Sequence, residues 1–554
     1  MMLRPLLALL LWLATGQATA GPELPLFSAA SRSPRHDITD AKVSSVSSVA
    51  TAGAWVRDKQ VVRARAVDID LPLLAQPMAD LAKTPRPKQA LALDLFDDVH
   101  FVADLDGIER TARGAAWIGR LRGVEKSQVV FVVSGDIVMG NIVSPAGRYH
   151  IRYSGDGLHE VQAIDSSLFD KDEPFIPAAD IFSSDTRGGL PLPDAPLGDD
   201  GSFIDVMVVY TATTRAAAGG TAPMQALIDL AVAETNVSYA NSGVIQRIRL
   251  VHSEEVAYDE AATDPLYAAL QCIRDPADGC LDQIHSLRDT YGADLVSFWL
   301  ENGGGYCGLG YQMESVSVAF AAYSFSAVAR SCATGYYSFG HELGHNMGAK
   351  HDEYVDKGSL PYSYAHGYAY PAGKWRTVMA YNNACSAQGV NCSRIPYWSN
   401  PANSYAGATM GNATADNRQT LNNTAPTVAS FRQAAVVGIP VLSNRSPMAN
   451  LSGSAESELH YRIHVPPGAR DLQFSIAGGI GDADLYVRYG SAPTTSLFDC
   501  RPYLDGNTES CTFGTPTAGD WYVMVRGYGD FSGVTLLGRY VPNISHLYWL
   551  ILGE

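Results

Sequence analysis

Apolar and polar positions divide this chain into three stretches with different spacing. Between residues 61 and 163, short apolar runs end at Gly and Asp turns, as in Val129–Val133 and Tyr149–Tyr153, which predicts a β-rich region. Between residues 204 and 300, apolar runs of strand length alternate with helical spacing. Between residues 454 and 540, short runs separated by Gly-rich turns predict a β-sandwich. We therefore expect an α+β protein with several domains.

The middle stretch predicts a mostly parallel sheet with helices packed on it, because strand and helix patterns follow each other in turn. Its predicted elements are strands at Ile204–Tyr210, Ile248–Val251 and Leu295–Leu300 and helices at 224–239 and 282–291. A chain of 554 residues is too long for a single core, so separate domains are expected on either side of this sheet.

The first residues predict a secretory signal peptide at 1–20. Arg4 gives a positive start, Leu6–Leu13 is a short apolar run, and Ala18–Ala20 is a small-residue cleavage site. That run is too short to cross a bilayer, and we expect no transmembrane segment elsewhere. The net charge of −17 argues against nucleic acid or an anionic membrane as a partner. We expect a secreted, extracellular and monomeric protein.

The cysteines predict disulfide bonds, because their number is even and the chain is expected to be exported. Proximity favours three short loops, Cys272–Cys280, Cys385–Cys392 and Cys500–Cys511, and elimination then joins Cys307 to Cys332. Sequence cannot fix this connectivity. Zinc binding by cysteines is disfavoured, because the sequence has no Cys-x-x-Cys pair.

A short segment that begins at His341 contains the candidate metal ligands and the candidate general base. On a helix, residues four apart share a face, so His341 and His345 can point at one place. A straight helix would put His351 roughly 15 Å along the axis from His341, out of reach of a shared ion. The helix must therefore end between them, and Gly348 is able to turn the chain there. Glu342 lies beside the open metal position, where it can take a proton from bound water.

The spacing His-Glu-x-x-His-x-x-Gly-x-x-His over residues 341–351 resembles the signature of the metzincin zinc metallopeptidases. A second element agrees, because Thr377–Tyr381 carries Met379, and in metzincins such a methionine closes a turn beneath the zinc-bound imidazoles. Asp352 is similar to the reprolysin (adamalysin) branch, whereas Tyr381 is similar to astacins and serralysins, where a tyrosine at this place is a further zinc ligand. We favour a reprolysin-like enzyme. Tyr381 stays a candidate ligand or oxyanion stabiliser, with a core tyrosine as the alternative.

The resemblance implies hydrolysis of peptide bonds by a zinc metalloendopeptidase. Zinc would be held by His341, His345 and His351 with a fourth position for water, and Glu342 would be the general base. One rival interpretation is a secreted adhesin or binding protein on a catalytically inactive metzincin scaffold. Another is a structural zinc site, but such sites fill four protein ligands, whereas this motif offers three. We expect a secreted zymogen that acts on proteins or peptides.

A signal followed by a β-rich region, a linker and a protease implies a pro-region at 21–198 before a catalytic domain at 199–435. The linker near residues 183–200 is rich in Gly, Pro and Asp, and we predict proteolytic processing within 185–200, where Arg187–Gly189 offers a site. No cysteine precedes residue 272, so a thiolate cannot silence the zinc. Asp136 or Asp156 could supply a carboxylate instead, or the pro-region could cover the cleft.

Two further expectations come from the metzincin resemblance. Val316–Phe320 resembles the edge strand that binds an extended substrate by strand addition. The region from Met379 to Trp398 would wall the pocket for the residue after the scissile bond.

The last stretch resembles the bacterial pre-peptidase C-terminal domain in Gly481–Val487, Cys500–Tyr503 and Gly519–Val523. We expect this domain at 454–540, after a linker at 436–453 and before a tail at 541–554. Asp482 and Asp484 are candidate Ca²⁺ ligands, although such residues more often shape turns.

Overall fold

The chain forms two compact units, Met1–Ala434 and Ala435–Glu554, each described here by itself. The computed structural model describes residues 23–30, 58–79, 90–170, 176–177, 203–432, 442–466, 468–490, 492–495 and 498–542. The predicted signal peptide and the predicted processing segment lie outside these ranges. Within the described ranges, no helix combines the length and apolar character that a bilayer crossing requires.

The first part of unit 1 is a ten-stranded sheet in the order β1-β4-β5-β6-β7-β8-β9-β10-β3-β2. The β-rich pattern of the sequence is therefore confirmed, and the pairings are antiparallel except between β1 and β4. Its elements are β1 (Glu23–Pro25), β2 (Phe27–Ala29), β3 (Val61–Ile69), α1 (Leu71–Ala79), β4 (Ala90–Phe96), β5 (Val99–Arg110), β6 (Ala115–Leu121), β7 (Gln128–Ser134), β8 (Ile137–Ser144), β9 (Gly147–Gly155), β10 (Leu158–Ile164) and η1 (Ser166–Leu168).

The second part of unit 1 is a six-stranded sheet in the order β11-β15-β16-β14-β12-β13. It is parallel apart from the antiparallel pair β15–β16, so the mostly parallel sheet is confirmed. Its strands and the helices around it are β11 (Ile176–Pro177), β12 (Phe203–Thr211), α3 (Ala212–Ala217), α4 (Thr221–Ser242), β13 (Arg247–Val256), α5 (Pro265–Arg274), α6 (Gln283–Tyr291), β14 (Leu295–Leu300), β15 (Gly308–Gln312), η2 (Val318–Tyr323), β16 (Phe325–Ala329), α7 (Arg330–Ala333), α8 (Ser338–Asn346) and α10 (Asn417–Val428).

Short elements between α8 and α10 complete unit 1. They are β17 (Ala369–Tyr370), η3 (Pro371–Gly373), β18 (Trp375–Arg376), α9 (Asn383–Ser386), β19 (Ser393–Arg394), β20 (Asn400–Tyr405) and β21 (Ala408–Met410). Strands β17, β18 and β19 form one small sheet, and β20 and β21 form another.

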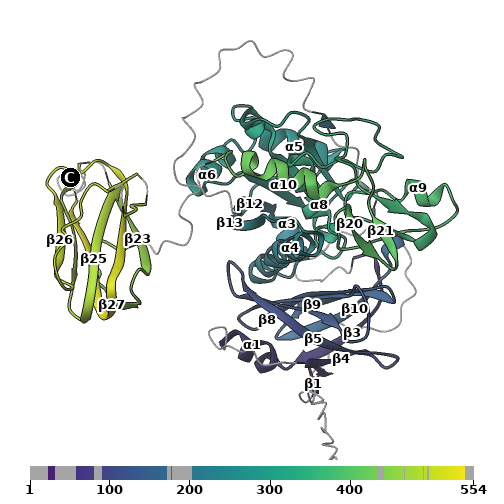
Figure 1. Ribbon diagram of the computed structural model, residues 1–554, viewed down its shortest axis with the longest axis horizontal. Coiled ribbons are helices and arrows are strands. Elements are labelled where there is room, and N and C mark those ends of the chain that lie inside the picture. Colours follow the sequence, from purple (N-terminus) through teal and green to yellow (C-terminus); the bar gives the residue numbers. More distant parts are fainter. Residues whose placement is uncertain are drawn as a thin grey trace, which may run out of the picture. The chain divides into compact units, whose positions relative to one another are not determined.

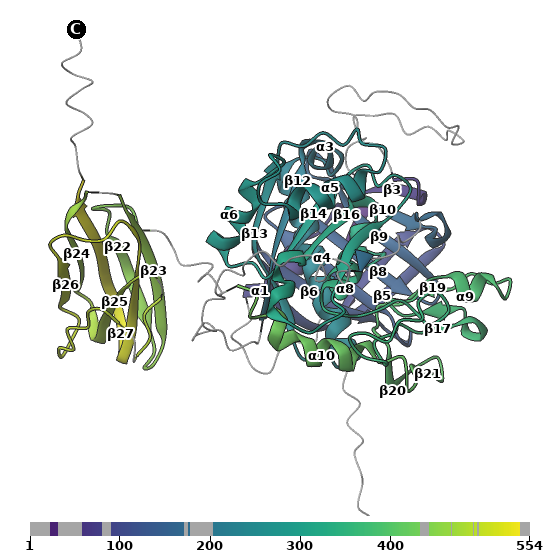
Figure 2. The ribbon, with the colours of Figure 1, turned by 90° about the horizontal axis from the view of Figure 1, so that it is seen from above.

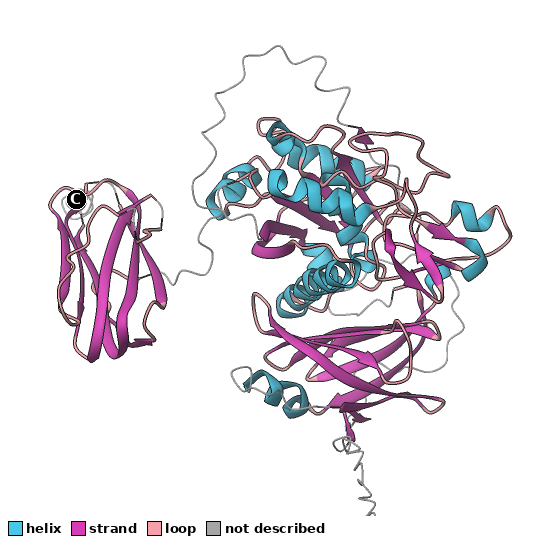
Figure 3. Cartoon of the chain, viewed as in Figure 1, coloured by secondary structure: helices cyan, strands magenta, loops and turns pink. Residues whose placement is uncertain are grey.

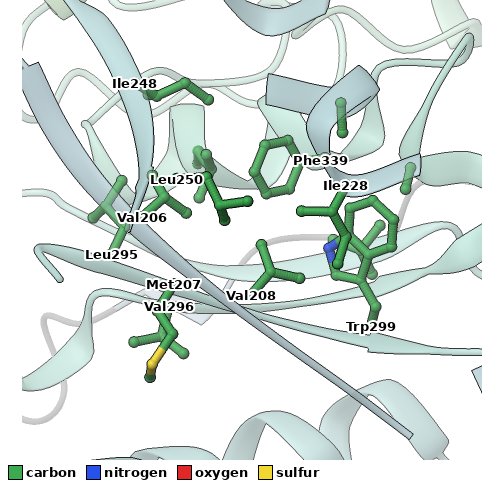
Figure 4. Close-up of a cluster of buried hydrophobic side chains, with 14 of the residues drawn as sticks. Val206, Met207, Val208, Ile228, Ile248, Leu250, Leu295, Val296, Trp299 and Phe339 are labelled. Atoms are coloured by element: carbon green, nitrogen blue, oxygen red, sulfur yellow. The ribbon is translucent and has the colours of Figure 1, made fainter. Parts of the chain in front are cut away.

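The core of the second part lies where α4 and α8 pack on the parallel sheet. Val206 and Met207, adjacent residues of β12, are both fully buried, and Figure 4 shows Ile228 of α4 and Phe339 of α8 gathered near Trp299 of β14. Alternate strand residues point to opposite faces, so both faces of this sheet are apolar. This packing fixes α8 against the sheet, and α8 carries the candidate site.

Helix α4 also packs on the ten-stranded sheet, as Figures 1 and 2 show. In β7, Phe131 belongs to the core that the ten-stranded sheet makes by itself, whereas its neighbours Val130 and Val132 join the core around α4. An antiparallel sheet usually leaves one face in water. Here both faces are apolar, because α4 covers the second one.

The predicted edge strand at Val316–Phe320 is wrong. Ser317 instead caps the 3-10 helix η2, with its side chain accepting a hydrogen bond from the Ala319 N–H. The strand next to β16 is β15, whose two glycines gave it a turn-like sequence. A polar cap residue thus decided the local structure against an apolar run.

Unit 2 contains strands in its described residues, as Figure 3 shows. The long strand β27 pairs with β23 and β25 through its first half and with β22 and β24 through its second half. Tyr461, Phe474, Leu485 and Trp521 belong to the core between these strands. The strands are β22 (Met448–Gly453), β23 (Glu458–Val465), β24 (Arg470–Ala477), β25 (Ile480–Tyr489), β26 (Glu509–Phe513) and β27 (Gly519–Val541).

The predicted linker at 436–453 is too long at its C-terminal end. Met448–Gly453 forms strand β22, which pairs with β27. Its pairing is irregular, with register shifts on both sides of Leu451 and a positive φ of 62° at Asn450, so the sequence lacks a clean strand pattern.

All four predicted disulfides are confirmed: Cys272–Cys280, Cys307–Cys332, Cys385–Cys392 and Cys500–Cys511.

Candidate metal centre

Helix α8 places His341 and His345 on one face and then ends before His351. Its last turn is closed by hydrogen bonds from Gly348 N to His345 O (2.9 Å) and from Ala349 N to Gly344 O (2.8 Å). Gly348 has a φ of 87°, which favours glycine. A Cβ there would also lie 2.8 Å from Pro361 Cγ, so space and backbone angle both require glycine. The chain reverses at this point, as the spacing predicts.

The reversal brings three buried imidazoles together. His341 Nε2 lies 3.2 Å from His351 Nε2, and His345 Nε2 lies 2.9 Å from His351 Nε2. Each of the three side chains is at most 2% exposed. Among the described residues, these histidines form the group of ligand atoms close enough to share one metal ion.

Hydrogen bonds to Nδ1 of His341 and of His345 determine which ring nitrogen of each side chain can bind a metal ion. His341 Nδ1 lies 2.9 Å from Val378 O, and His345 Nδ1 lies 2.9 Å from both Gln312 Oε1 and Ala349 O. Since these partners are acceptors, each Nδ1 carries the proton and each Nε2 presents a lone pair to the centre. Tetrahedral zinc with Zn–N bonds of about 2.0–2.1 Å separates its nitrogen ligands by roughly 3.3 Å. The three nitrogens therefore fit a zinc ion.

Burial favours the neutral form of His341 and His351, which metal binding requires. The pKa of His341 lies well below its usual value because of burial and, next, the positive charge of Arg394. The pKa of His351 is lowered in the same way, first by burial and then by the neighbouring histidines.

Glu342 lies against strand β15 rather than among the three imidazoles. A Cβ at Gly308 would come within 2.8 Å of Glu342 Cδ, and one at Gly310 would lie 3.2 Å from Glu342 Oε2. The two glycines are two residues apart and so share one face of the strand. The sequence interpretation missed them, although paired glycines inside a strand mark a close approach. The carboxylate is therefore held between α8 and β15.

A tight turn at Thr377–Ala380 lies under α8. Ala380 N donates to Thr377 O (3.1 Å), and Met379 is fully buried. A Cβ at Gly344 of α8 would meet Met379 Sδ at 2.9 Å, so the sulfur lies directly beneath the helix. The turn and the helix are thus packed as one body.

Asp352 and Tyr381 join this turn to the third histidine. Asp352 Oδ2 accepts from Tyr381 N (2.8 Å), and burial raises the pKa of this carboxyl group. The ring of Tyr381 lies 4.0 Å from that of His351. The structure therefore brings the candidate Tyr381 beside the cluster.

Other candidates lie elsewhere. Asp136 and Asp156 are exposed turn residues and are not part of the histidine group. In unit 2, Asp484 forms an ion pair with Arg501 at 2.9 Å, and Asp482 Oδ1 accepts from Gly506 N. These contacts match those of residues that shape turns.

The chain is similar in sequence to bacterial peptidases. The chain is 39% identical over 318 residues to a peptidyl-Asp metalloendopeptidase of Xanthomonas campestris pv. campestris, a match covering 56% of this chain and 72% of that protein. A peptidyl-Asp metalloendopeptidase of Stenotrophomonas maltophilia is also 39% identical, covering 55% of this chain and 71% of that protein. A hemagglutinin/proteinase of Vibrio cholerae is 45% identical over 129 residues, 21% of each chain.

A histidine cluster with a neighbouring carboxylate, on a helix packed against a mostly parallel sheet, is typical of metallopeptidases. Residues 201–399 match metallo-peptidase family M12, and residues 458–527 match the bacterial pre-peptidase C-terminal domain. The chain belongs to metallopeptidase family M12 and is a zinc metalloendopeptidase with a pre-peptidase C-terminal domain.

Proposed function

We propose that this chain is an exported endopeptidase, made as a zymogen, in which His341, His345 and His351 hold the zinc ion and Glu342 is the general base. The observation that carries the proposal is the convergence of three buried ring nitrogens beside a buried carboxylate. Four disulfides and the signal-like residues 1–20 support export, because disulfides persist in oxidising compartments.

The mechanism divides the work among a few residues. The chemistry that zinc supplies when bound at such a site is acidification of water and polarisation of a carbonyl group. Glu342 accepts the proton of the attacking water and passes it to the leaving amine. Val378 O and Gln312 Oε1 hold the rings of His341 and His345 in place. Met379 would be the methionine of the metzincin turn, and Tyr381 would assist zinc in stabilising the oxyanion.

The N-terminal part supports the zymogen proposal through a backbone contact. Ile176 and Pro177 of β11 pair with Tyr311 and Gln312 of β15, the strand that would form the edge of the sheet without β11. A peptide substrate would add to the same edge, because its backbone groups are the ones a strand can bind. Latency would follow from occupation of this edge before processing in the segment 185–200.

We further propose a preference for peptides that contain aspartate at the cleaved position. The two relatives from Xanthomonas and Stenotrophomonas carry the name peptidyl-Asp metalloendopeptidase.

Casein hydrolysis with and without a chelator tests the function. The processed protein should digest casein, lose this activity with 1,10-phenanthroline, and recover it on addition of zinc. Activity that survives complete removal of zinc would contradict the proposal. Binding of casein without cleavage would instead favour an adhesin on an inactive scaffold.

A further inference from the structure

Two buried arginines lie side by side next to the histidine cluster. Arg376 of β18 and Arg394 of β19 are paired in register on parallel strands and are 3% and 1% exposed. Paired residues on neighbouring strands point to the same face of a sheet. Full burial of two guanidinium groups is uncommon in proteins and needs a specific reason.

Both side chains meet at Tyr336, which lies just before α8. Arg394 Nη1 donates to Tyr336 O (3.1 Å), and its guanidinium lies 4.3 Å from the Tyr336 ring centre. Arg376 Nη2 donates to the Tyr336 hydroxyl group (2.7 Å). Because α8 begins at Ser338 and carries His341, the arginines flank the first turn of the helix that presents the cluster.

The two arginines differ in what they hold. Arg376 also donates to Ala380 O and Cys392 O, so it braces the turn under α8 and the disulfide loop. The main chain of Arg394 is fixed from the N-terminal part, where Arg148 Nη2 donates to Arg394 O (2.7 Å). Val378, in the turn that Arg376 braces, holds the ring of His341 through its carbonyl oxygen (2.9 Å), so the paired arginines lie beside the cluster.

We propose that Arg394 binds the carboxylate of an acidic substrate side chain next to the scissile bond, with Arg376 holding it in place and adding positive charge. A guanidinium group matches a carboxylate in shape and can bind it through two hydrogen bonds. The inference rests on the proposed peptidase function, and it names the residue that would give an aspartate preference.

Two fluorogenic peptides that differ in one residue test this inference. They carry Asp or the isosteric Asn at the position beside the cleaved bond. The processed wild-type enzyme should cleave the Asp peptide with a higher kcat/KM. In Arg394→Gln the Asp-to-Asn ratio should fall by roughly 10- to 100-fold, the size expected for a charge-assisted hydrogen bond. Arg215→Gln, a change of a partly exposed arginine paired with Glu255, is the matched control and should keep the wild-type ratio.

The outcomes separate the two proposals. A wild-type enzyme that cleaves neither peptide contradicts the peptidase function. An enzyme that cleaves both equally, or an Arg394→Gln variant with normal zinc content and an unchanged ratio, overturns the role of Arg394. If that variant does not fold, Arg394→Lys takes its place: it keeps the charge but loses the planar fork, so its Asp-to-Asn ratio should fall below the wild-type ratio, and an unchanged ratio would overturn the role of Arg394. Succinate should compete with cleavage of the Asn peptide more strongly than succinamide does, and equal effects would overturn the inference.

Discussion

At the scale of single residues, the site depends on which atoms of each side chain are engaged. The far nitrogens of His341 and His345 are bonded to oxygens, so their near nitrogens are left as acceptors for a cation. Glu342, one residue after the first histidine, points instead at β15. Ligands and base therefore have separate positions although they adjoin in sequence.

Glu342→Gln tests the role of the base. The amide keeps the size of the carboxylate but cannot accept a proton, so zinc content should stay at the wild-type level while kcat falls by about 10²–10⁴-fold. Metal analysis and peptide cleavage on the same sample measure both. Full turnover by this variant would remove Glu342 from the mechanism.

At the scale of elements, strand β15 packs closely against helix α8 because two of its residues are glycines. Gly308 and Gly310 let the strand approach Glu342 more closely than any side chain would allow. The same strand bears Gln312, which holds His345. Strand β15 thus sets the position of the base and of one ligand.

Gly308→Ala should therefore lower activity without removing zinc. The added methyl group collides with the Glu342 carboxylate, and displacement of the base should reduce kcat by roughly 10²-fold. Gly514→Ala is the control, because a Cβ at Gly514 would meet no atom within 4 Å. If Gly308→Ala keeps the wild-type kcat at equal zinc content, the close approach of β15 to Glu342 does not matter for catalysis.

The sequence predicted those features that depend on local spacing. The ring positions follow from the 341–351 pattern, and the turn at Gly348 follows from the reach of a helix. The sequence did not predict features that are set by tertiary contacts, such as the strand at Gly308–Gln312 and the pairing of Arg376 with Arg394. Neighbours distant in the chain decide these, as they decide the helical turn found at Val318–Tyr323.

At the scale of the first unit, α4 is shared by two sheets. Its side toward the ten-stranded sheet carries Asp229, whose carboxylate is fully buried and forms an ion pair with Arg113 (2.9 Å). Val130 and Val132 add apolar contacts on the same face. Separation of the N-terminal part would expose these residues, so we expect these contacts to hold it on the catalytic part until the linker is cut.

Arg113→Ala should weaken this attachment. It leaves the Asp229 carboxylate buried without its guanidinium partner, a change that costs about 3 kcal/mol of unfolding free energy. Arg120→Ala, which removes an exposed pair with Asp106, should cost less than about 1 kcal/mol. Denaturant unfolding measures both, and gel filtration of the cleaved protein shows whether the fragments stay together. Equal stability of the two variants would contradict the buried role of Arg113.

X-ray absorption at the zinc edge, combined with metal analysis of the purified protein, tests the central claim most directly. The account predicts one zinc ion per chain with three imidazole nitrogens at about 2.0–2.1 Å, and loss of that signal in His345→Ala. A protein without transition metal, or a zinc ion bound elsewhere than at His341, His345 and His351, would contradict it.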